Sequence, residues 1–176
     1  MTNRLYRNYI KRFLDIVLSA GAIVVLSPVM AVTAILVWIK LGSPVIFKQK
    51  RPGKDERIFE MYKFRSMTDA RDKNGELLPD EVRLTSFGKK LRASSLDELP
   101  ELFDIFRGKM SIVGPRPEMV ENVEKYTKEL PEFAYRQRAK AGLTGMAQIY
   151  GKYNTSPKDK LIFDLTYINE YSVWLD

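Results

Sequence analysis

The chain is 176 residues long and carries 29 lysines and arginines against 22 aspartates and glutamates, with no histidine and no cysteine. These two absences exclude a cysteine nucleophile, a serine–histidine couple, thiolate or imidazole zinc sites and any disulfide. The length favours one domain with a single core, and the positive charge is concentrated in residues 1–65, where twelve basic and four acidic residues give a net charge of +8.

The first predicted element is an uncharged apolar segment of 24 residues, residues 16–39. As one helix it would be about 36 Å long, which is enough to cross a hydrocarbon core of about 30 Å. A signal peptide fits poorly, because the apolar region is too long and no small-residue cleavage site follows it. Ser27 and Pro28 stand at its centre, where the proline removes a backbone donor and the serine hydroxyl can bond to a freed backbone group.

Basic residues flank this segment on both sides, so the flanks give no orientation signal for a crossing. They suit a segment that enters and leaves through the same membrane leaflet. We therefore expect residues 1–40 to form a basic arm and a re-entrant membrane segment, helix–break–helix, with the break at Ser27 and Pro28. A kinked helix that spans the membrane remains the alternative.

The remainder of the chain predicts a hairpin followed by helices. Short β-branched and aromatic runs at residues 44–49 and 57–64 flank a turn-rich stretch, which is typical of a β-hairpin. From residue 86 onward helical spacing dominates, and residues 118–130 and 156–175 each place apolar residues three and four positions apart. The predicted fold class is α+β and predominantly helical.

Two adjacent carboxylates, Asp97 and Glu98, are the first candidates for chemistry. Ser95 followed three residues later by Glu98 is a capping-box pattern, and Pro100 suits a first turn, so we expect a helix to begin here. Acidic residues in a first turn often do no more than complement the helix dipole. The same position can bind a phosphate through free backbone N–H groups, and a carboxylate there can attack phosphorus. Both interpretations remain open on these residues alone.

Basic side chains without nearby acidic partners in the sequence are candidates for gripping phosphate oxygens. They are Lys63, Arg65, Arg92 and Arg116. A guanidinium group matches phosphate with two parallel hydrogen bonds, whereas lysine acts as a point charge. Each of these residues could equally be an ordinary solvated side chain. Further along, Gly142 and Gly145 would permit a tight loop that a ligand could approach.

Nucleotide-binding and metal motifs are scarce. The sequence contains no Walker A pattern and no GxGxxG after a strand, so neither a P-loop nor a Rossmann site is predicted. A magnesium ion held by one or two carboxylates plus substrate phosphates would leave no signature beyond Asp97 and Glu98.

An ordered set of sequence blocks resembles the bacterial sugar transferase family, the monotopic phosphoglycosyl transferases. The blocks are KRFLDIVLS, FKQKRPG, YKFRSM, SLDELPEL, GKMSIVGPRPE, GLTGMAQI and YINEYSVWLD, and the resemblance covers residues 8–176.

The resemblance implies an enzyme at the cytoplasmic face of the bacterial plasma membrane, with residues 41–176 as its catalytic domain. Such an enzyme moves a sugar 1-phosphate from a UDP-sugar to undecaprenyl phosphate and releases UMP, as the first membrane step of a glycan pathway. The family's nucleophile falls on Asp97, which would form a covalent phospho-sugar intermediate, and Glu98 lies beside it with Mg²⁺ as the cofactor. Arg92 and Arg116 are similar to the family's phosphate-handling residues.

The resemblance also extends to the basic block and to the membrane segment. Lys63 and Arg65 fall in the family's basic block, and Ser27–Pro28 matches its re-entrant break. The chain departs from the family at Lys109 and Ala141, which replace an acidic residue and a proline that are common there. Family chains commonly continue with a basic amphipathic helix, so we expect that element to be shorter or missing here, and we expect no large N-terminal regulatory region.

A membrane-anchored basic protein that binds anionic lipid or nucleic acid is the alternative function, and the charge of the first 65 residues is its supporting feature. Nucleic acid is not an expected partner, because no stacking series of aromatic residues accompanies that charge. UDP-sugar, undecaprenyl phosphate and membrane lipid are the expected partners. The sequence does not identify the sugar or the pathway, and it leaves a homodimer open.

Overall fold

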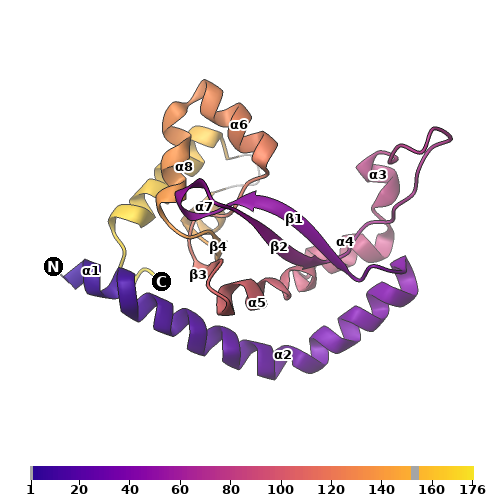
Figure 1. The fold of residues 1–176 in the computed structure, drawn as a ribbon, viewed down its shortest axis with the longest axis horizontal. Coiled ribbons are helices and arrows are strands. Elements are labelled where there is room, and N and C mark those ends of the chain that lie inside the picture. The colour runs from indigo at the N-terminus through magenta and orange to yellow at the C-terminus, as the bar shows by residue number, and fades with distance from the viewer. Residues whose placement is uncertain (1, 152–154) are drawn as a thin grey trace.

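The computed structural model describes residues 2–151 and 155–176, which form a mostly helical protein with one long helix along its lower side (Figure 1). The helical elements are α1 (Thr2–Leu5), the π-helix η1 (Tyr6–Ile10), α2 (Lys11–Leu41), the 3₁₀ turn η2 (Lys54–Glu56), α3 (Asp80–Arg83), α4 (Ser86–Ala93), the 3₁₀ turn η3 (Leu96–Glu98), α5 (Glu101–Phe106), α6 (Val120–Glu129), the 3₁₀ helix η4 (Pro131–Arg138), α7 (Met146–Ile149) and α8 (Pro157–Asn169). The strands are β1 (Ile46–Pro52), β2 (Ile58–Phe64), β3 (Ser111–Val113) and β4 (Gly142–Thr144). The predominantly helical α+β class is confirmed.

The long helix α2 is bent near its middle but is not interrupted (Figure 1). Pro28 lies inside this continuous helix, so the predicted break into two helices at Ser27 and Pro28 is wrong. Proline lacks the N–H that would bond to the carbonyl of Val24, and the Ser27 hydroxyl donates to that carbonyl at 2.8 Å instead. This local compensation lets the helix continue through the proline. From Tyr6 to Leu41 the helical run is long and apolar enough to cross a membrane.

Polar contacts of Arg12 and Asp15 help to fasten the first half of α2 to the body of the protein. The Arg12 guanidinium donates to the carbonyls of Ile105 and Phe106, each at 2.7 Å, and so binds carbonyls at the end of α5. The buried Asp15 carboxylate accepts from the Ser111 hydroxyl at 2.8 Å, beside the backbone of β3. Both contacts pull this half of α2 against the same side of the domain.

The second half of α2 ends against the base of the hairpin. Arg65, which directly follows β2, donates to the carbonyls of Leu41 and Ser43 and forms an ion pair of 3.0 Å with Asp69. A cation at this place satisfies orphan carbonyls and complements the negative end of the helix dipole. Both ends of α2 are therefore held by one domain.

The predicted hairpin is confirmed. β1 pairs with β2 in an antiparallel register that runs from Ile46 opposite Phe64 to Pro52 opposite Ile58. Figure 1 shows it crossing the middle of the protein above α5. Helices at residues 118–130 and 156–175 are confirmed in shortened form as α6 and α8. α6 starts two residues later and ends one residue earlier than predicted, and α8 starts one residue later and ends six residues earlier.

The two glycines of the GLTG block do not form an open loop. Gly142 begins β4, which pairs in parallel with β3. A Cβ at Gly142 would lie 2.2 Å from the backbone nitrogen of Gly114, and one at Gly145 would lie 2.2 Å from its carbonyl oxygen. These glycines serve close packing of backbone against backbone, so the predicted ligand-approach loop is wrong for them.

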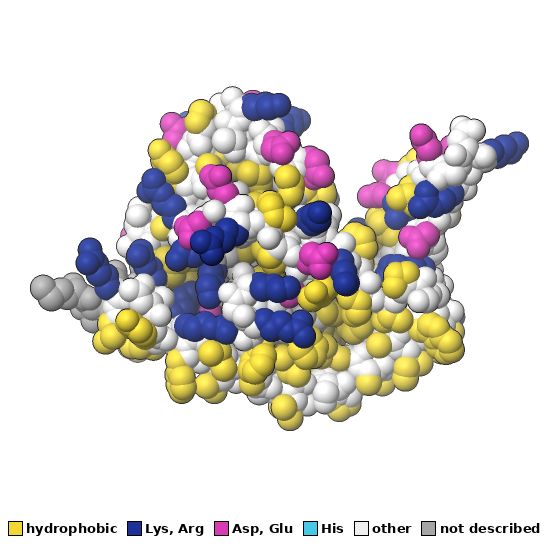
Figure 2. Space-filling model, viewed as in Figure 1, with side chains coloured by type: hydrophobic (Ala, Val, Ile, Leu, Met, Phe, Trp, Pro, Cys, Tyr) yellow, Lys and Arg dark blue, Asp and Glu magenta, His cyan; other side chains and the backbone are white. Residues whose placement is uncertain are grey.

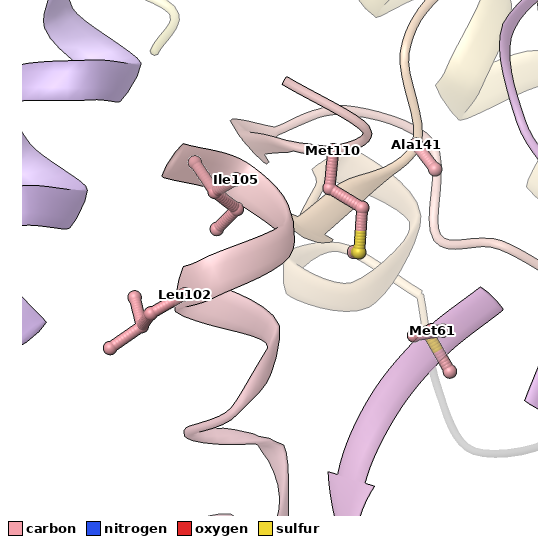
Figure 3. Packing of buried hydrophobic residues seen from close by; sticks show 5 residues of the cluster. All are labelled: Met61, Leu102, Ile105, Met110 and Ala141. Atoms are coloured by element: carbon pink, nitrogen blue, oxygen red, sulfur yellow. The ribbon is translucent and has the colours of Figure 1, made fainter. Parts of the chain in front are cut away.

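Two clusters of buried side chains join α2 to the rest of the protein. The first cluster consists of Met61, Leu102, Ile105, Met110 and Ala141 (Figure 3), and residues of the first half of α2 pack against it. The second consists of Val37, Leu41, Phe64 and Leu91. Leu99 packs against both clusters, and Leu96 packs against the second. The segment that carries Asp97 and Glu98 is thus anchored on the inner side of the bent helix.

Candidate active site

Asp97 and Glu98 lie in η3, a single 3₁₀ turn between α4 and α5. Ser95 precedes this turn in a left-handed conformation, with φ of 55°, and its side chain makes no capping hydrogen bond. The predicted capping box is therefore wrong. The next helix, α5, begins only at Glu101 after Pro100, whose fixed φ suits a helix start.

Asp97 is a nearly buried carboxylate, with 7% of its surface exposed. Burial raises its pKa, the nearby Lys63 and Arg92 oppose that effect, and the neighbouring Glu98 adds to it. Within residues 2–151 and 155–176, no other residue forms an ion pair or a side-chain hydrogen bond with the Asp97 carboxylate. Its own backbone N–H contributes a hydrogen bond to this carboxylate, but no cation that the structure describes holds it in an ion pair as Glu98 is held.

Glu98, in contrast, is held firmly by two cations. Arg116 donates to both of its oxygens, with Nη1 at 3.3 Å from Oε2 and Nη2 closer to Oε1. Lys63 Nζ lies 2.7 Å from Oε1. Burial acts to raise the pKa of Glu98, but the hydrogen bonds from Arg116 and Lys63 outweigh it and hold the pKa below its usual value. Glu98 is thus a fixed anion that positions two cations beside Asp97.

Glu101 is a member of this cluster that the sequence did not point to. It is 2% exposed, and its Oε1 lies 3.1 Å from Lys63 Nζ without meeting hydrogen-bond geometry. Burial raises the pKa of Glu101 to about 7, although Lys63 works against that rise. In the sequence it looks like an ordinary acid in a first turn. Its spacing of three residues from Glu98 was the available signal, because residues so spaced face the same side of a helix.

The predicted phosphate-gripping cations divide into two groups. Lys63 and Arg116 meet at Glu98, so the expectation that they lack acidic partners is wrong. Arg92 is placed near Asp97 and donates from Nε to the Ser66 hydroxyl at 2.9 Å. Arg65 is instead buried at the end of α2, where its guanidinium is engaged by backbone carbonyls. The structure thus brings three of the four cations to the Asp97–Glu98 pair.

Arg136 holds the backbone at Arg116 in place, and the sequence analysis did not identify it. It is buried, and its Nε lies 2.5 Å from the Asp164 carboxylate. Its Nη2 donates to the backbone carbonyl of Arg116 at 3.0 Å. Pro115 and Pro117 also restrict the backbone on either side. These contacts fix the origin of the Arg116 side chain, and no local sequence pattern links residues so far apart.

A divalent cation fits this site through one protein carboxylate. Within the described residues, no three or more acidic, histidine or cysteine side chains are arranged so that they could hold a metal ion together. Magnesium is commonly bound by one or two carboxylates together with substrate phosphates. Both Glu98 oxygens are already bonded to Arg116 or Lys63, whereas the oxygens of Asp97 have no such partner. Asp97 is therefore the residue that could hold the ion together with a bound diphosphate.

Comparison with known proteins gives a consistent result. The sequence model described as "Bacterial sugar transferase" matches residues 6–176. The chain is 42% identical over 167 residues to "Uncharacterized sugar transferase EpsL" of Bacillus subtilis, covering 95% of this chain and 81% of that protein. It is 38% identical over 173 residues to the "UDP-N-acetylgalactosamine-undecaprenyl-phosphate N-acetylgalactosaminephosphotransferase" of Aeromonas hydrophila, covering 96% of this chain and 41% of the relative.

A third relative extends this pattern. The chain is 40% identical over 173 residues to the "UDP-glucose:undecaprenyl-phosphate glucose-1-phosphate transferase" of Klebsiella pneumoniae, covering 94% of this chain and 37% of that protein. The chain thus spans about two fifths of the length of these last two relatives, 41% and 37%. The match to the family sequence model takes in every residue of the site. The chain belongs to the bacterial sugar transferase family.

Proposed function

We propose that the chain transfers a sugar 1-phosphate from a UDP-sugar to undecaprenyl phosphate and releases UMP, as the first membrane step of a glycan pathway. Relatives named for this reaction with UDP-glucose and UDP-N-acetylgalactosamine support the reaction class. The observation that carries the proposal is the contrast between the two neighbouring acids. Glu98 is fixed by Arg116 and Lys63, whereas Asp97 is buried beside those cations and forms no ion pair within the described residues.

In the first step, an Asp97 oxygen attacks the β-phosphorus of the UDP-sugar. The bond between that phosphorus and the oxygen that bridges it to the α-phosphorus breaks. UMP leaves, and the sugar phosphate remains on Asp97 as an acyl phosphate. In the second step, a phosphate oxygen of undecaprenyl phosphate attacks the same phosphorus, and the Asp97 carboxylate is released. Both attacking groups are anions, so neither step needs a base to remove a proton. A chain without histidine can perform this reaction.

The cations supply the electrostatic part of catalysis. Lys63, Arg92 and Arg116 are placed around Asp97, where they would offset the charge on the phosphoryl oxygens as the bond to UMP breaks. Glu98 keeps Lys63 and Arg116 in position before the substrate binds, which lowers the entropy that is lost when the site is ordered around the substrate. Mg²⁺, held by Asp97 and the diphosphate, would neutralise further negative charge.

Replacing Asp97 by asparagine is the decisive test. Wild-type protein mixed with a radiolabelled UDP-sugar and Mg²⁺, without acceptor, should release one equivalent of UMP and retain a hydroxylamine-sensitive sugar phosphate. Asp97→Asn should do neither, whereas the exposed Asp80→Asn should behave as wild type. Turnover by Asp97→Asn would disprove the covalent route. Absence of UMP release by the wild type with a panel of UDP-sugars and undecaprenyl phosphate would disprove the reaction itself.

We also propose that α2 enters and leaves the membrane from the cytoplasmic face. The support is that Arg12 and Arg65 tie the two halves of the bent helix to one domain. Since the chain has no cysteine, single cysteines at Asn8 and Lys40, both exposed, would report on each end separately. An impermeant maleimide should label both from the cytoplasmic side only. Labelling of the two positions from opposite sides would establish a spanning helix instead.

A further inference from the structure

A group of cations that the catalytic proposal does not use lies above the first half of α2. We name it the cationic surface, and its members are Arg12, Lys48, Lys54, Arg107, Lys109 and Lys140. They come from five separate parts of the chain, namely α2, β1, η2, the turn after α5, and the segment before β4. Figure 2 shows lysine and arginine side chains gathered over the middle of the protein, directly above the apolar side chains of its lower edge.

Several contacts place these cations close together. The Nζ atoms of Lys48 and Lys109 lie 5.6 and 4.9 Å from the centroid of the same Tyr62 ring. The Arg12 guanidinium packs against Gly108, between Arg107 and Lys109, at 3.1 Å from where a Cβ would stand. These contacts link strand β1, the turn after α5 and helix α2 into one charged area.

Lys140 joins the same area from the other side. Burial lowers the pKa of Lys140, and the nearby Arg12 and Lys54 lower it further, while Asp15 opposes them. Like charges gathered in this way repel one another, so their proximity raises the electrostatic free energy of the protein without a bound ligand. An external anion would relieve that repulsion.

The two buried acids of this region are hydrogen-bonded to the backbone, and the exposed Asp55 and Glu56 that follow Lys54 form no ion pair within the described residues. Asp15 and Asp104 are buried, and they accept hydrogen bonds from the backbone N–H groups of Ile112 and Tyr62. Lys109 lies 3.6 Å from Asp104, whereas Lys48, Lys54, Arg107 and Lys140 form no ion pair with any residue that the structure describes. Their charge is therefore presented to solvent.

The edge of the cationic surface that faces α2 is apolar. Phe13 and Val17 of α2 are 64% and 49% exposed, and Phe106 at the end of α5 is 44% exposed. Arg12, which directly precedes Phe13, donates to the carbonyl of Phe106. Apolar side chains next to a row of cations match the acyl and headgroup layers of a membrane, in that order.

We propose that the cationic surface binds the headgroups of anionic phospholipids in the leaflet that holds α2. This is a lipid site separate from the Asp97 cluster, and it requires no transfer reaction. Charge complementarity favours an anionic lipid over a zwitterionic one, and the adjacent apolar edge favours a membrane over a soluble polyanion. Its occupation would fix the depth of the first half of α2.

The test compares lipid retention by three forms of the full chain. Each form is placed in nanodiscs made from equal amounts of phosphatidylcholine and phosphatidylglycerol, and native mass spectrometry identifies the lipids that stay bound on release. The test variant is Lys48→Gln/Arg107→Gln/Lys140→Gln, which breaks no ion pair in the described structure. The matched control is Lys73→Gln/Lys125→Gln/Lys128→Gln, three exposed cations of the segment between β2 and α3 and of α6, which lies on the opposite side of the protein from α2 in Figure 1.

Wild type and control should retain phosphatidylglycerol in preference to phosphatidylcholine. Each cation near an anionic surface contributes about a fivefold preference, so the test variant should lose a factor of up to roughly 100. The preference of the wild type should also shrink in high salt, because screening shortens the range of these charges. An unchanged preference in the test variant, or an equal loss in the control, would overturn the proposal. Equal melting curves for the two variants would exclude unfolding as the cause of the loss.

Discussion

Glu101 gives the sharpest test of the electrostatics of the site. It is 2% exposed, and burial raises its pKa from 4.5 to about 7. The perturbation is Glu101→Gln, which keeps the shape of the side chain and removes its charge. The substitution also removes the 3.1 Å ion pair between Glu101 Oε1 and Lys63 Nζ, and the raised pKa already includes the effect of that ion pair.

The sign of the effect follows from proton binding. Between pH 4.5 and about 7, the native state keeps a proton on Glu101 while the unfolded chain has lost it. Folding stability due to this residue therefore falls as the pH rises through that window, and it is constant below and above it. One pKa unit corresponds to about 1.4 kcal/mol, so the full loss is about 3 kcal/mol. For a chain of this size, that corresponds to a melting shift of about 6–12 °C.

The assay is thermal unfolding of wild type and Glu101→Gln in detergent, measured from pH 4.5 to pH 8.5. At pH 4.5 the two melting temperatures should be close, because both side chains are neutral. At pH 8.5 the variant should melt about 6–12 °C above the wild type. Other buried acids titrate in both proteins and cancel in the difference. A difference that stays flat across the pH range would refute the reasoning, because Glu101 would then be ionised at an ordinary pKa.

Two further substitutions test local structure. Arg65→Gln should lower the melting temperature and leave the KM for UDP-sugar unchanged, because Arg65 binds carbonyls at the end of α2; a raised KM at unchanged stability would restore its predicted contact with phosphate. Ser95→Gly should stabilise the protein by roughly 0.5–1 kcal/mol, because glycine adopts a φ of 55° without strain. Ser95→Ala should change stability little in the same melting assay, and a loss of about 1 kcal/mol would indicate a capping bond after all.

The elements that the sequence predicted well depend on local patterns. The hairpin of β1 and β2 follows from two short β-branched runs around a turn, and its register needs no distant contact. The capping box failed because Ser95 adopts a left-handed conformation and Pro100 moves the helix start to Glu101. A break in α2 was predicted at Ser27 and Pro28, but the helix continues there because the Ser27 hydroxyl donates to the freed carbonyl of Val24.

The sequence predicted most residues of the site but not the ion pairs between them. Asp97, Glu98 and the cations were identified as candidates, yet their ion pairs join residues that lie far apart in the chain. Lys63 and Glu98 are separated by 35 positions, and Arg116 and Glu98 by 18. No periodicity reports such pairs, because they depend on how β2, η3 and the segment after β3 pack. Arg65 illustrates the same limit. It was predicted to bind phosphate, but its guanidinium donates to the carbonyl of Leu41 at the end of α2.

The pairing of these charges has a consequence for substrate binding. Three cations, Lys63, Arg92 and Arg116, face three carboxylates, Asp97, Glu98 and Glu101. With every group ionised the cluster is neutral, and it would attract a diphosphate weakly. A pKa of about 7 leaves Glu101 partly protonated near neutral pH, which gives the cluster an excess of positive charge. The same burial that destabilises the folded protein therefore prepares the site for an anion, since Lys63 can turn from a neutral Glu101 toward phosphate.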